Sequence, residues 1–264
     1  MLDRPGVGIE SYMANMNEPR TFALPADFDD ETLFAMMLRV DVLENEFRKH
    51  SGGQPNPTWV QFATACDGIR TRFRTMAESD DAFRAIIPKG AETHEDRYEE
   101  ERSLFAFFTS LVSAFECTCY MLYALGSQLD PMGFKMFTEE QRKAIGPRQT
   151  YEVYKRRYLQ EAVTPALGGL FAATGHFEDA YKYRNLLSHR GLVQRTMNAE
   201  FNMGFGPPQH VVLGGPNSTI TPTMDGIPMD ANLTASRRAW IASWLSDILD
   251  ATLAFANDKI APTS

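Results

Sequence analysis

The sequence of 264 residues predicts an all-α protein, a helical bundle with a small β-hairpin or loop insert before its C-terminal helix. Over most of the chain, apolar residues recur at the three- and four-residue spacing of an amphipathic helix. The second half of residues 93–127 is apolar on nearly every face, as expected of a buried central helix. Helix-breaking glycine and proline are concentrated in residues 194–232. We therefore expect one helical domain, residues 28–264, with residues 194–232 as its insert.

The first helix is expected to begin at the acidic pair Asp29 and Asp30. Residues 1–27 have no helical period and carry three prolines, so they are expected to form an extended N-terminal arm. The helix that follows has acidic residues at its start and basic residues at its end, 48–50, which complements the helix dipole. A loop rich in glycine and proline, residues 51–57, ends it.

Two further helices are predicted before the longest one. Thr58 is expected to cap a helix that runs to about Glu78, and a short helix follows over residues 80–87. The longest helix is predicted over residues 93–127, with strongly acidic first turns and an apolar second half. Glu116 is the exception within that apolar half. We expect it to be paired or at an edge, and the alternative is a supporting role beside a functional site.

The chain after the longest helix is expected to be broken into shorter pieces. A connector over residues 126–146 should contain one short helix, because residues 138–141 have the composition of a capping box. The next helix is predicted over residues 150–173. Pro165 and the two glycines at 168–169 are expected to break or bend it.

The last third of the chain contains two predicted helices separated by the insert. The first covers residues 177–192, and the C-terminal helix covers residues 232–256 with an apolar, tryptophan-containing face. Within the insert, residues 210–213 and 218–221 flank a Gly-Gly-Pro-Asn turn as two short strand candidates. A small hairpin or an ordered functional loop is expected there, because long structureless loops are uncommon in compact domains.

Composition predicts a soluble, cytoplasmic protein. The formal net charge of −8 argues against broad nonspecific attraction to nucleic acid, so any RNA-binding charge must be local. The three cysteines form no disulfide framework and are expected to be buried thiols in a reducing compartment. Residues 1–20 lack the apolar core of a signal peptide, and no apolar run reaches the roughly 20 residues that span a bilayer. We therefore expect no membrane partner.

An arginine, an adjacent amide and a histidine stand out in the helix predicted over residues 177–192: Arg184, Asn185 and His189. Asn185 and His189 are four residues apart and share one face of a continuous helix. Arg184 and His189 are five residues apart and diverge by roughly 140°. These two side chains converge more easily if the helix ends or loosens near His189, and Gly191 is a suitable terminator.

Metal-free RNA cleavage is the chemistry that these residue types suit. A histidine whose pKa lies near neutrality can take the proton from a ribose 2′-OH or deliver one to the leaving oxygen. An arginine is always charged and forked, which suits an anionic phosphoryl transition state. One histidine does not easily act as both base and acid in a single cleavage. A second copy from a symmetric partner is therefore expected, which favours a homodimer with a shared cleft.

The pattern Arg184-Asn185-x-x-x-His189 resembles the signature of the HEPN (higher eukaryotes and prokaryotes nucleotide-binding) superfamily. This resemblance implies an α-helical bundle, frequent dimerisation with the motifs facing each other, and often metal-independent endoribonuclease activity in toxin–antitoxin, phage-defence or RNA-processing systems. An antitoxin or defence-system protein then becomes a candidate partner. In toxin members a tyrosine often follows two positions after the motif histidine. This chain has Gly191 there, which argues against regulation through that position.

The catalytic residues predicted for such a site are Arg184 for the phosphate, His189 for proton transfer and Asn185 for orienting the site or the dimer contact. Single-stranded or looped RNA is the expected substrate, and secondary contacts to its phosphates are expected from Lys182, Arg190 and Arg195. Between residues 142 and 195, ten basic residues stand against four acidic ones, a local charge of +6. A solvated helix face is the alternative explanation of that charge.

No second motif competes with this one. The five histidines form no H-x-x-x-H or H-E-x-x-H pair, so no metal ion is expected. There is no phosphate loop or dinucleotide fingerprint, and no cofactor is expected. The main alternative to catalysis is a non-catalytic scaffold that binds a nucleotide, RNA or protein partner through the same groove. A third possibility is a structural dimer in which Arg184 and His189 only form interfacial hydrogen bonds.

Overall fold

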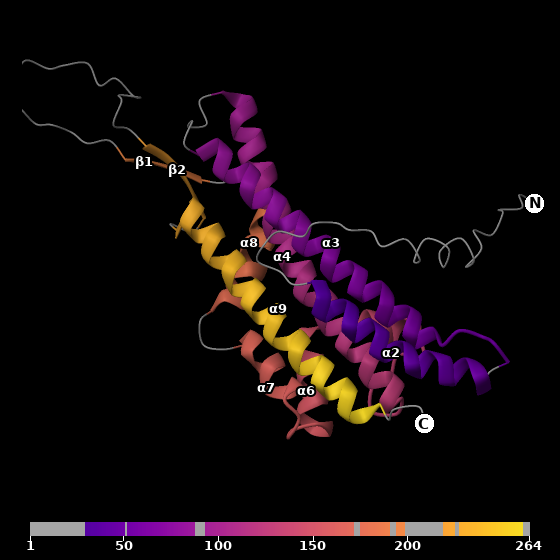
Figure 1. The fold of residues 1–264 in the computed structure, drawn as a ribbon. Coiled ribbons are helices and arrows are strands. Elements are labelled where there is room, and N and C mark those ends of the chain that lie inside the picture. The colour runs from indigo at the N-terminus through magenta and orange to yellow at the C-terminus, as the bar shows by residue number, and fades with distance from the viewer. Residues whose placement is uncertain are drawn as a thin grey trace, which may run out of the picture.

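The protein is an elongated bundle of helices with the strands β1 and β2 at one end (Figure 1). The computed structural model describes residues 30–50, 52–87, 93–171, 175–190, 194–198, 219–224 and 227–260. Nearly all of these residues are helical, which confirms the predicted all-α class. The expected arm over residues 1–27 lies outside the described residues. The first described helix, α2 (Asp30–His50), has the predicted basic last turn.

The helix α3 (Pro57–Ile86) is continuous, so the separate short helix predicted over residues 80–87 is wrong. Its cap also differs from the prediction at Thr58. Asn56 is the N-cap, and its side-chain oxygen accepts a hydrogen bond from the Thr58 backbone N–H at 2.9 Å. Pro57 then takes the first helical position, where the N–H that proline lacks would have had no partner within the helix. The N-cap therefore lies two residues earlier than expected.

The helix α4 (His94–Leu129) is the predicted longest helix and lies against α3 (Figure 1). Thr93 and Asp96 form a capping box at its start. The Asp96 backbone N–H donates to the Thr93 hydroxyl at 3.1 Å, and the Thr93 N–H donates to the Asp96 carboxylate at 3.0 Å. The apolar second half of α4 is almost entirely buried. Its neighbours are α3, α6, α8 and the C-terminal helix α9 (Ala231–Lys259).

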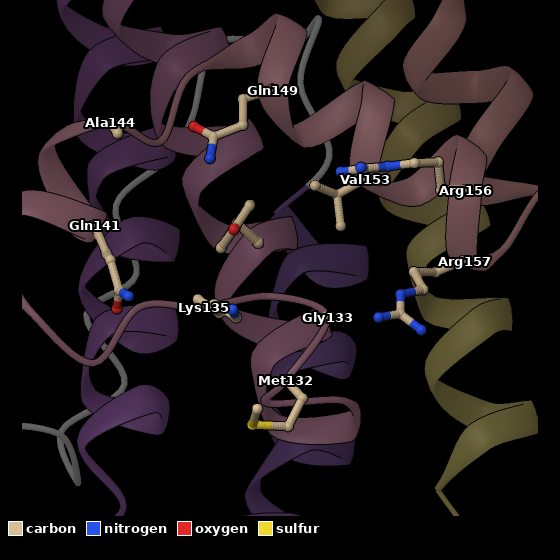
Figure 2. Close-up of a pocket in the computed structure, with 10 residues that line it drawn as sticks. Met132, Gly133, Lys135, Gln141, Ala144, Gln149, Val153, Arg156 and Arg157 are labelled. Atoms are coloured by element: carbon tan, nitrogen blue, oxygen red, sulfur yellow. The ribbon is translucent and has the colours of Figure 1, made fainter.

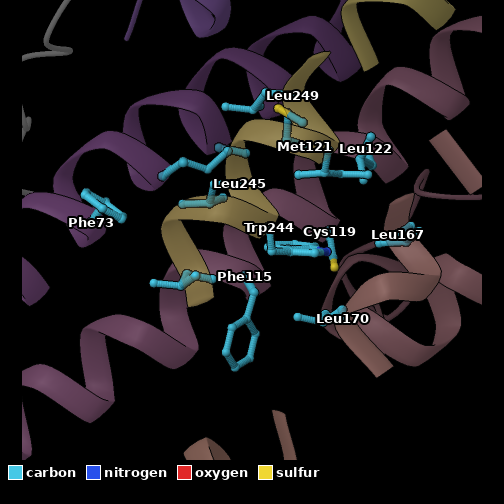
Figure 3. Packing of buried hydrophobic residues seen from close by; sticks show 14 of the residues in the cluster. Phe73, Phe115, Cys119, Met121, Leu122, Leu167, Leu170, Trp244, Leu245 and Leu249 are labelled. Carbon is cyan, nitrogen blue, oxygen red and sulfur yellow. The ribbon is translucent and has the colours of Figure 1, made fainter. Parts of the chain in front are cut away.

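The core is built on aromatic side chains that α4 shares with the helices around it. Trp244 of α9 lies near Cys119 and Leu167 in the close-up of the core (Figure 3). Its indole N–H donates to the Ala166 carbonyl at 3.2 Å, so the polar edge of the ring is satisfied inside the bundle. The largest fully buried side chains are Tyr154, Tyr183, Phe62, Phe73, Phe83, Phe107, Phe108, Phe115, Phe134 and Phe255.

The chain after α4 forms α5 (Glu139–Lys143) and α6 (Pro147–Arg157). Thr138 caps α5 through the predicted capping box with Gln141. The α6 helix ends at Arg157, well before the break expected at Pro165 and the glycines that follow it. The helix predicted over residues 150–173 is therefore broken, as expected, but at residues 158–162 and not at Pro165.

A nearby side chain caps the end of α6. The carbonyl of Tyr158 accepts a hydrogen bond at 2.6 Å from the hydroxyl of Thr164, so a side chain stabilises the end of the helix. The chain then resumes as α7 (Val163–Gly168) and the 3₁₀ turn η2 (Gly169–Phe171). Pro165 lies in the first turn of α7, where its missing N–H leaves no bond unmade.

The insert contains a small antiparallel sheet, but its pairing differs from the predicted hairpin. The strand β2 (Thr219–Met224) overlaps the predicted strand at 218–221. Its described partners are β1 (Gln194–Asn198) and β3 (Ile227–Pro228). The other predicted strand, residues 210–213, lies outside the described residues. The sheet therefore connects α8 and α9 through strands at the two ends of the insert.

Among the described residues, one helix meets the length and composition requirements of a membrane span. It is α4, whose most apolar stretch has a mean hydropathy of 1.4, and 61% of that stretch is buried inside the bundle. The core helix of a folded bundle has the same properties, so this observation is weak evidence for a membrane.

Gly126→Ala is expected to lower the thermal unfolding midpoint because α4 contacts a buried ring at this position. A Cβ at Gly126 would lie 2.6 Å from two carbons of the fully buried Phe134 ring. Overpacking of this kind costs about 1–3 kcal/mol, which exceeds the gain of about 1 kcal/mol from the better helix propensity of alanine. Gly169→Ala is the control, since its nearest contact would be 3.9 Å from Trp244. Equal midpoints for the two variants would contradict the expectation.

Candidate functional site

The predicted motif lies on α8 (His176–Arg190), which packs one face against α4. Tyr183 belongs to the buried face, and its ring centroid lies 5.0 Å from that of Phe108. Asn185 and His189 are exposed, four residues apart on the continuous helix. They therefore share a solvent-facing side of α8, as the sequence predicted.

Arg184 lies between these two faces and is half-buried. Its guanidinium carbon is 5.5 Å from the centroid of the Tyr181 ring, within the range of a cation–π contact. The Tyr181 hydroxyl donates a hydrogen bond to Glu116 Oε1 at 2.8 Å, which links α8 to α4. Burial raises the pKa of the Tyr181 phenol, and the Glu116 carboxylate raises it further, so the phenol remains a donor. The ring beneath Arg184 is thereby held in place.

Glu116 has the position that the sequence analysis allowed for it. The residue is exposed at the edge of α4 and is paired with Tyr181. Through the Tyr181 ring it supports the residue that carries the motif's charge, Arg184. Tyr181 itself was not predicted as a site residue. Its spacing of three from Arg184 on a helix is the sequence signal that could have identified it.

The Arg184 guanidinium retains an unused donor. Its Nε is buried and has no hydrogen-bond partner among the residues that the structure describes. A buried N–H without a partner costs on the order of 1–3 kcal/mol. Because this nitrogen is closed to solvent, a ligand could reach it only if the surrounding side chains moved.

Arg184 and His189 do not converge within one chain. We expected the helix to end or loosen near His189, but α8 continues through Arg190. Ser188 supports the last turn, because its hydroxyl donates to the Arg184 carbonyl at 2.7 Å. With five residues between them, the Arg184 and His189 side chains leave α8 about 140° apart. Regular helix through Arg190 therefore does not favour convergence of Arg184 and His189 inside one subunit.

Of the three residues predicted to make secondary phosphate contacts, the structure describes the side chain of Lys182. Lys182 is exposed on α8, near the solvent-facing side of the motif. Arg190 is the last residue of α8 and Arg195 lies in β1, but their side chains are outside the described residues.

The basic residues between 142 and 195 do not form one patch around the motif. Arg148 is ion-paired with Glu178 at 2.9 Å and lies over the Phe171 ring at 5.1 Å. Lys143 pairs with Glu139 at 2.6 Å, at the other end of the short α5 helix. The basic residues are therefore spread over α5, α6, α8 and β1, and the value of +6 already includes Glu178.

A buried charge network that the sequence analysis missed anchors the start of α8. Arg237 of α9 is 7% exposed, and its Nη2 donates to Asp179 Oδ2 at 2.8 Å. Its Nη1 contacts the His176 ring, which packs edge-to-face on Trp240 at 5.4 Å. Burial lowers the pKa of His176, and the charge of Arg237 lowers it further. An arginine inside the apolar run of the C-terminal helix was the available signal.

The described residues contain no group of three or more histidine, cysteine, aspartate or glutamate side chains that could hold a metal ion. Comparisons with known protein families, with curated proteins and with solved structures found no match. These comparisons therefore assign no family. The structure itself shows an all-α bundle that presents Asn185 and His189 to solvent beside a half-buried Arg184.

Proposed function

We propose that the protein is a metal-independent endoribonuclease of the HEPN type that acts as a homodimer. Arg184 binds the phosphate at which the chain is cut, and its charge stabilises the transition state. His189 transfers protons to and from the reacting oxygens. Asn185, on the same side of α8 as His189, orients the site or contacts the second subunit.

The state of Arg184 is the observation that supports this proposal most strongly. The side chain lies over the Tyr181 ring, which the hydrogen bond to Glu116 fixes in turn. The buried Nε has no partner in the described part of the chain, so the side chain is positioned but not saturated. A cation that is held in one position suits an anionic ligand.

The divergence of Arg184 and His189 supports a dimeric site. Because the two side chains leave α8 about 140° apart, one α8 helix does not direct both of them at the same phosphate. Two α8 helices that meet around a symmetry axis bring two exposed His189 side chains into one cleft. One copy can then act as base and the other as acid, which is the division that cleavage at a 2′-OH requires.

Incubation of the purified chain with single-stranded and structured RNA in excess chelator tests the proposal. We expect cleavage that leaves 2′,3′-cyclic phosphate ends, because the 2′-OH is the attacking group in a metal-free mechanism. Cleavage that appears only when Mg²⁺ or Mn²⁺ is restored would contradict the metal-independent chemistry. Size-exclusion chromatography with light scattering checks whether the active species is a dimer.

A non-catalytic scaffold that binds RNA, a nucleotide or a protein partner is the second candidate. The ion pair between Arg148 and Glu178 favours it, since a basic residue near α8 is already matched by an acidic one. The scaffold predicts that RNA raises the thermal midpoint of the protein without being cut at any chain concentration. The same incubation, followed by gel analysis and a melting curve, separates the two candidates.

A further inference from the structure

A concave site with a basic lining lies beside α6, away from the motif. Its volume is about 660 Å³, within the range of small-molecule pockets of about 300–1,000 Å³. In the close-up, the side chains of Arg156 and Arg157 extend from α6 on one side, and Gln141 lies on the opposite side (Figure 2). The lining residues are Tyr123, Met132, Gly133, Lys135, Gln141, Ala144, Gln149, Val153, Arg156 and Arg157.

The polar groups of this pocket are mainly donors, and none of the lining residues is acidic. Lys135, Arg156 and Arg157 are three cations from two segments of the chain. Gln141 becomes a donor because its Oε1 already accepts backbone N–H bonds, at 2.8 Å from Phe137 and 3.1 Å from Thr138. Its NH₂ group is what remains for a ligand. A cluster of donors without a lining carboxylate suits an anion.

The loop that carries Lys135 is held in one conformation. The Gly133 N–H donates to Asp130 Oδ1 at 2.9 Å, and the Phe134 N–H donates to the Asp130 carbonyl at 3.0 Å. Arg157 Nε forms an ion pair with Asp130 Oδ2 at 3.5 Å. A Cβ at Gly133 would lie 2.9 Å from the first atom and 2.2 Å from the second, so glycine leaves room for this pair. The fully buried Phe134 ring packs on Tyr123 at 5.3 Å. A fixed loop reduces the entropy lost when a ligand binds.

The dipole of α6 accounts for only part of this arrangement. Basic residues in the last turn of a helix commonly offset its negative end, which explains Arg156 and Arg157 without any ligand. It does not explain why Lys135 and Gln141, which belong to other segments, line the same hollow. Arg156 is exposed, and its Nε bonds only the Glu152 carbonyl of its own helix, at 3.3 Å. Its terminal nitrogens therefore remain for a ligand.

We propose that this pocket binds a compact small molecule that carries two or three phosphate groups. Lys135, Arg156 and the Gln141 amide supply donors for such a ligand, while Arg157 is paired with Asp130 at 3.5 Å. The hollow form favours a small molecule over a long nucleic acid strand. The site is separate from the motif. Tyr123 of the pocket is 15 residues along α4 from Phe108, which contacts Tyr183, and this corresponds to about 22 Å of helix. The proposal does not depend on ribonuclease activity.

Isothermal titration of the full chain with inorganic tripolyphosphate, at constant ionic strength and without divalent metal, tests the proposal. We expect saturable binding that Lys135→Ala and Arg156→Ala each weaken about tenfold or more, the effect of losing one charge-assisted contact. Lys155→Ala is the matched control. It removes the same charge from an exposed position on α6, but its Nζ lies 5.9 Å from the Tyr151 ring centroid and does not line the pocket. It is expected to bind as the wild type does.

Two results would overturn the proposal. The first is no saturable heat with millimolar tripolyphosphate, or equal weakening by all three substitutions, which would indicate only nonspecific charge attraction. The second is binding of single-stranded RNA, but not of tripolyphosphate, that is lost in Lys135→Ala and Arg156→Ala, which would make the pocket part of an RNA surface. Tighter binding of ATP than of tripolyphosphate would support the proposal and would show that a nucleoside adds contacts.

Discussion

His189→Ala is expected to lower the rate of RNA cleavage by about 10²–10⁴-fold, the usual contribution of a positioned general acid or base. The fold should persist, because His189 is exposed in the last turn of α8 and contributes nothing to the buried core. The measurement is the initial cleavage rate of one RNA in chelator, with circular dichroism to confirm helix content. His94→Ala is the control, since His94 is also an exposed histidine at a helix end. Equal rates for the two variants would exclude His189 from catalysis.

Mixing subunits tests whether the site is shared between chains. Random pairing of equal amounts of wild-type and His189→Ala chains places two intact histidines in about a quarter of the dimers. If cleavage needs both copies, a fixed amount of wild type should lose about half of its activity when the variant is added and the chains exchange. Unchanged activity would show that each chain acts alone, contrary to the arrangement inferred from the divergence of Arg184 and His189.

Helix starts that are specified by consecutive residues could be predicted from the sequence. Thr93 caps α4, and Thr138 caps α5 through Gln141, because a capping box needs only four neighbouring residues. The motif helix was predicted from its apolar residues over 177–192, and α8 covers His176–Arg190. Regular helix between Arg184 and His189 keeps their side chains about 140° apart.

Features that depend on distant residues could not be predicted in this way. The α6 helix ends at Arg157, where Thr164 bonds the Tyr158 carbonyl and Lys259 of α9 pairs with the nearby Glu161 at 2.7 Å. The pocket beside α6 likewise needs a loop, a capped helix and α6 in their folded positions. No local periodicity contains that information, because the contacting residues are far apart in the chain.

Asp80→Ala is expected to destabilise the protein by about 3–5 kcal/mol, the usual cost of removing one partner from a buried charge network. Asp80 has no exposed surface, and its carboxylate joins α3 to α9. Arg84 Nη2 lies 2.9 Å from Oδ2 and Arg84 Nε 3.0 Å from Oδ1, while Arg238 Nη1 of α9 lies 3.3 Å from Oδ2. Alanine would leave the largely buried Arg238 without its buried counter-charge. Urea unfolding at fixed protein concentration measures the change.

A substitution at Asp81, the residue next to Asp80, tests whether burial or charge alone determines the loss of stability. Asp81 also pairs with Arg238, at 3.0 Å, but its side chain is 70% exposed. Water screens such a pair, so Asp81→Ala is expected to cost less than about 1 kcal/mol. Both variants remove one negative charge from neighbouring positions of α3 and lose one contact to the same arginine. Similar unfolding midpoints would mean that the Asp80 network contributes little, and that apolar packing alone holds α3 against α9.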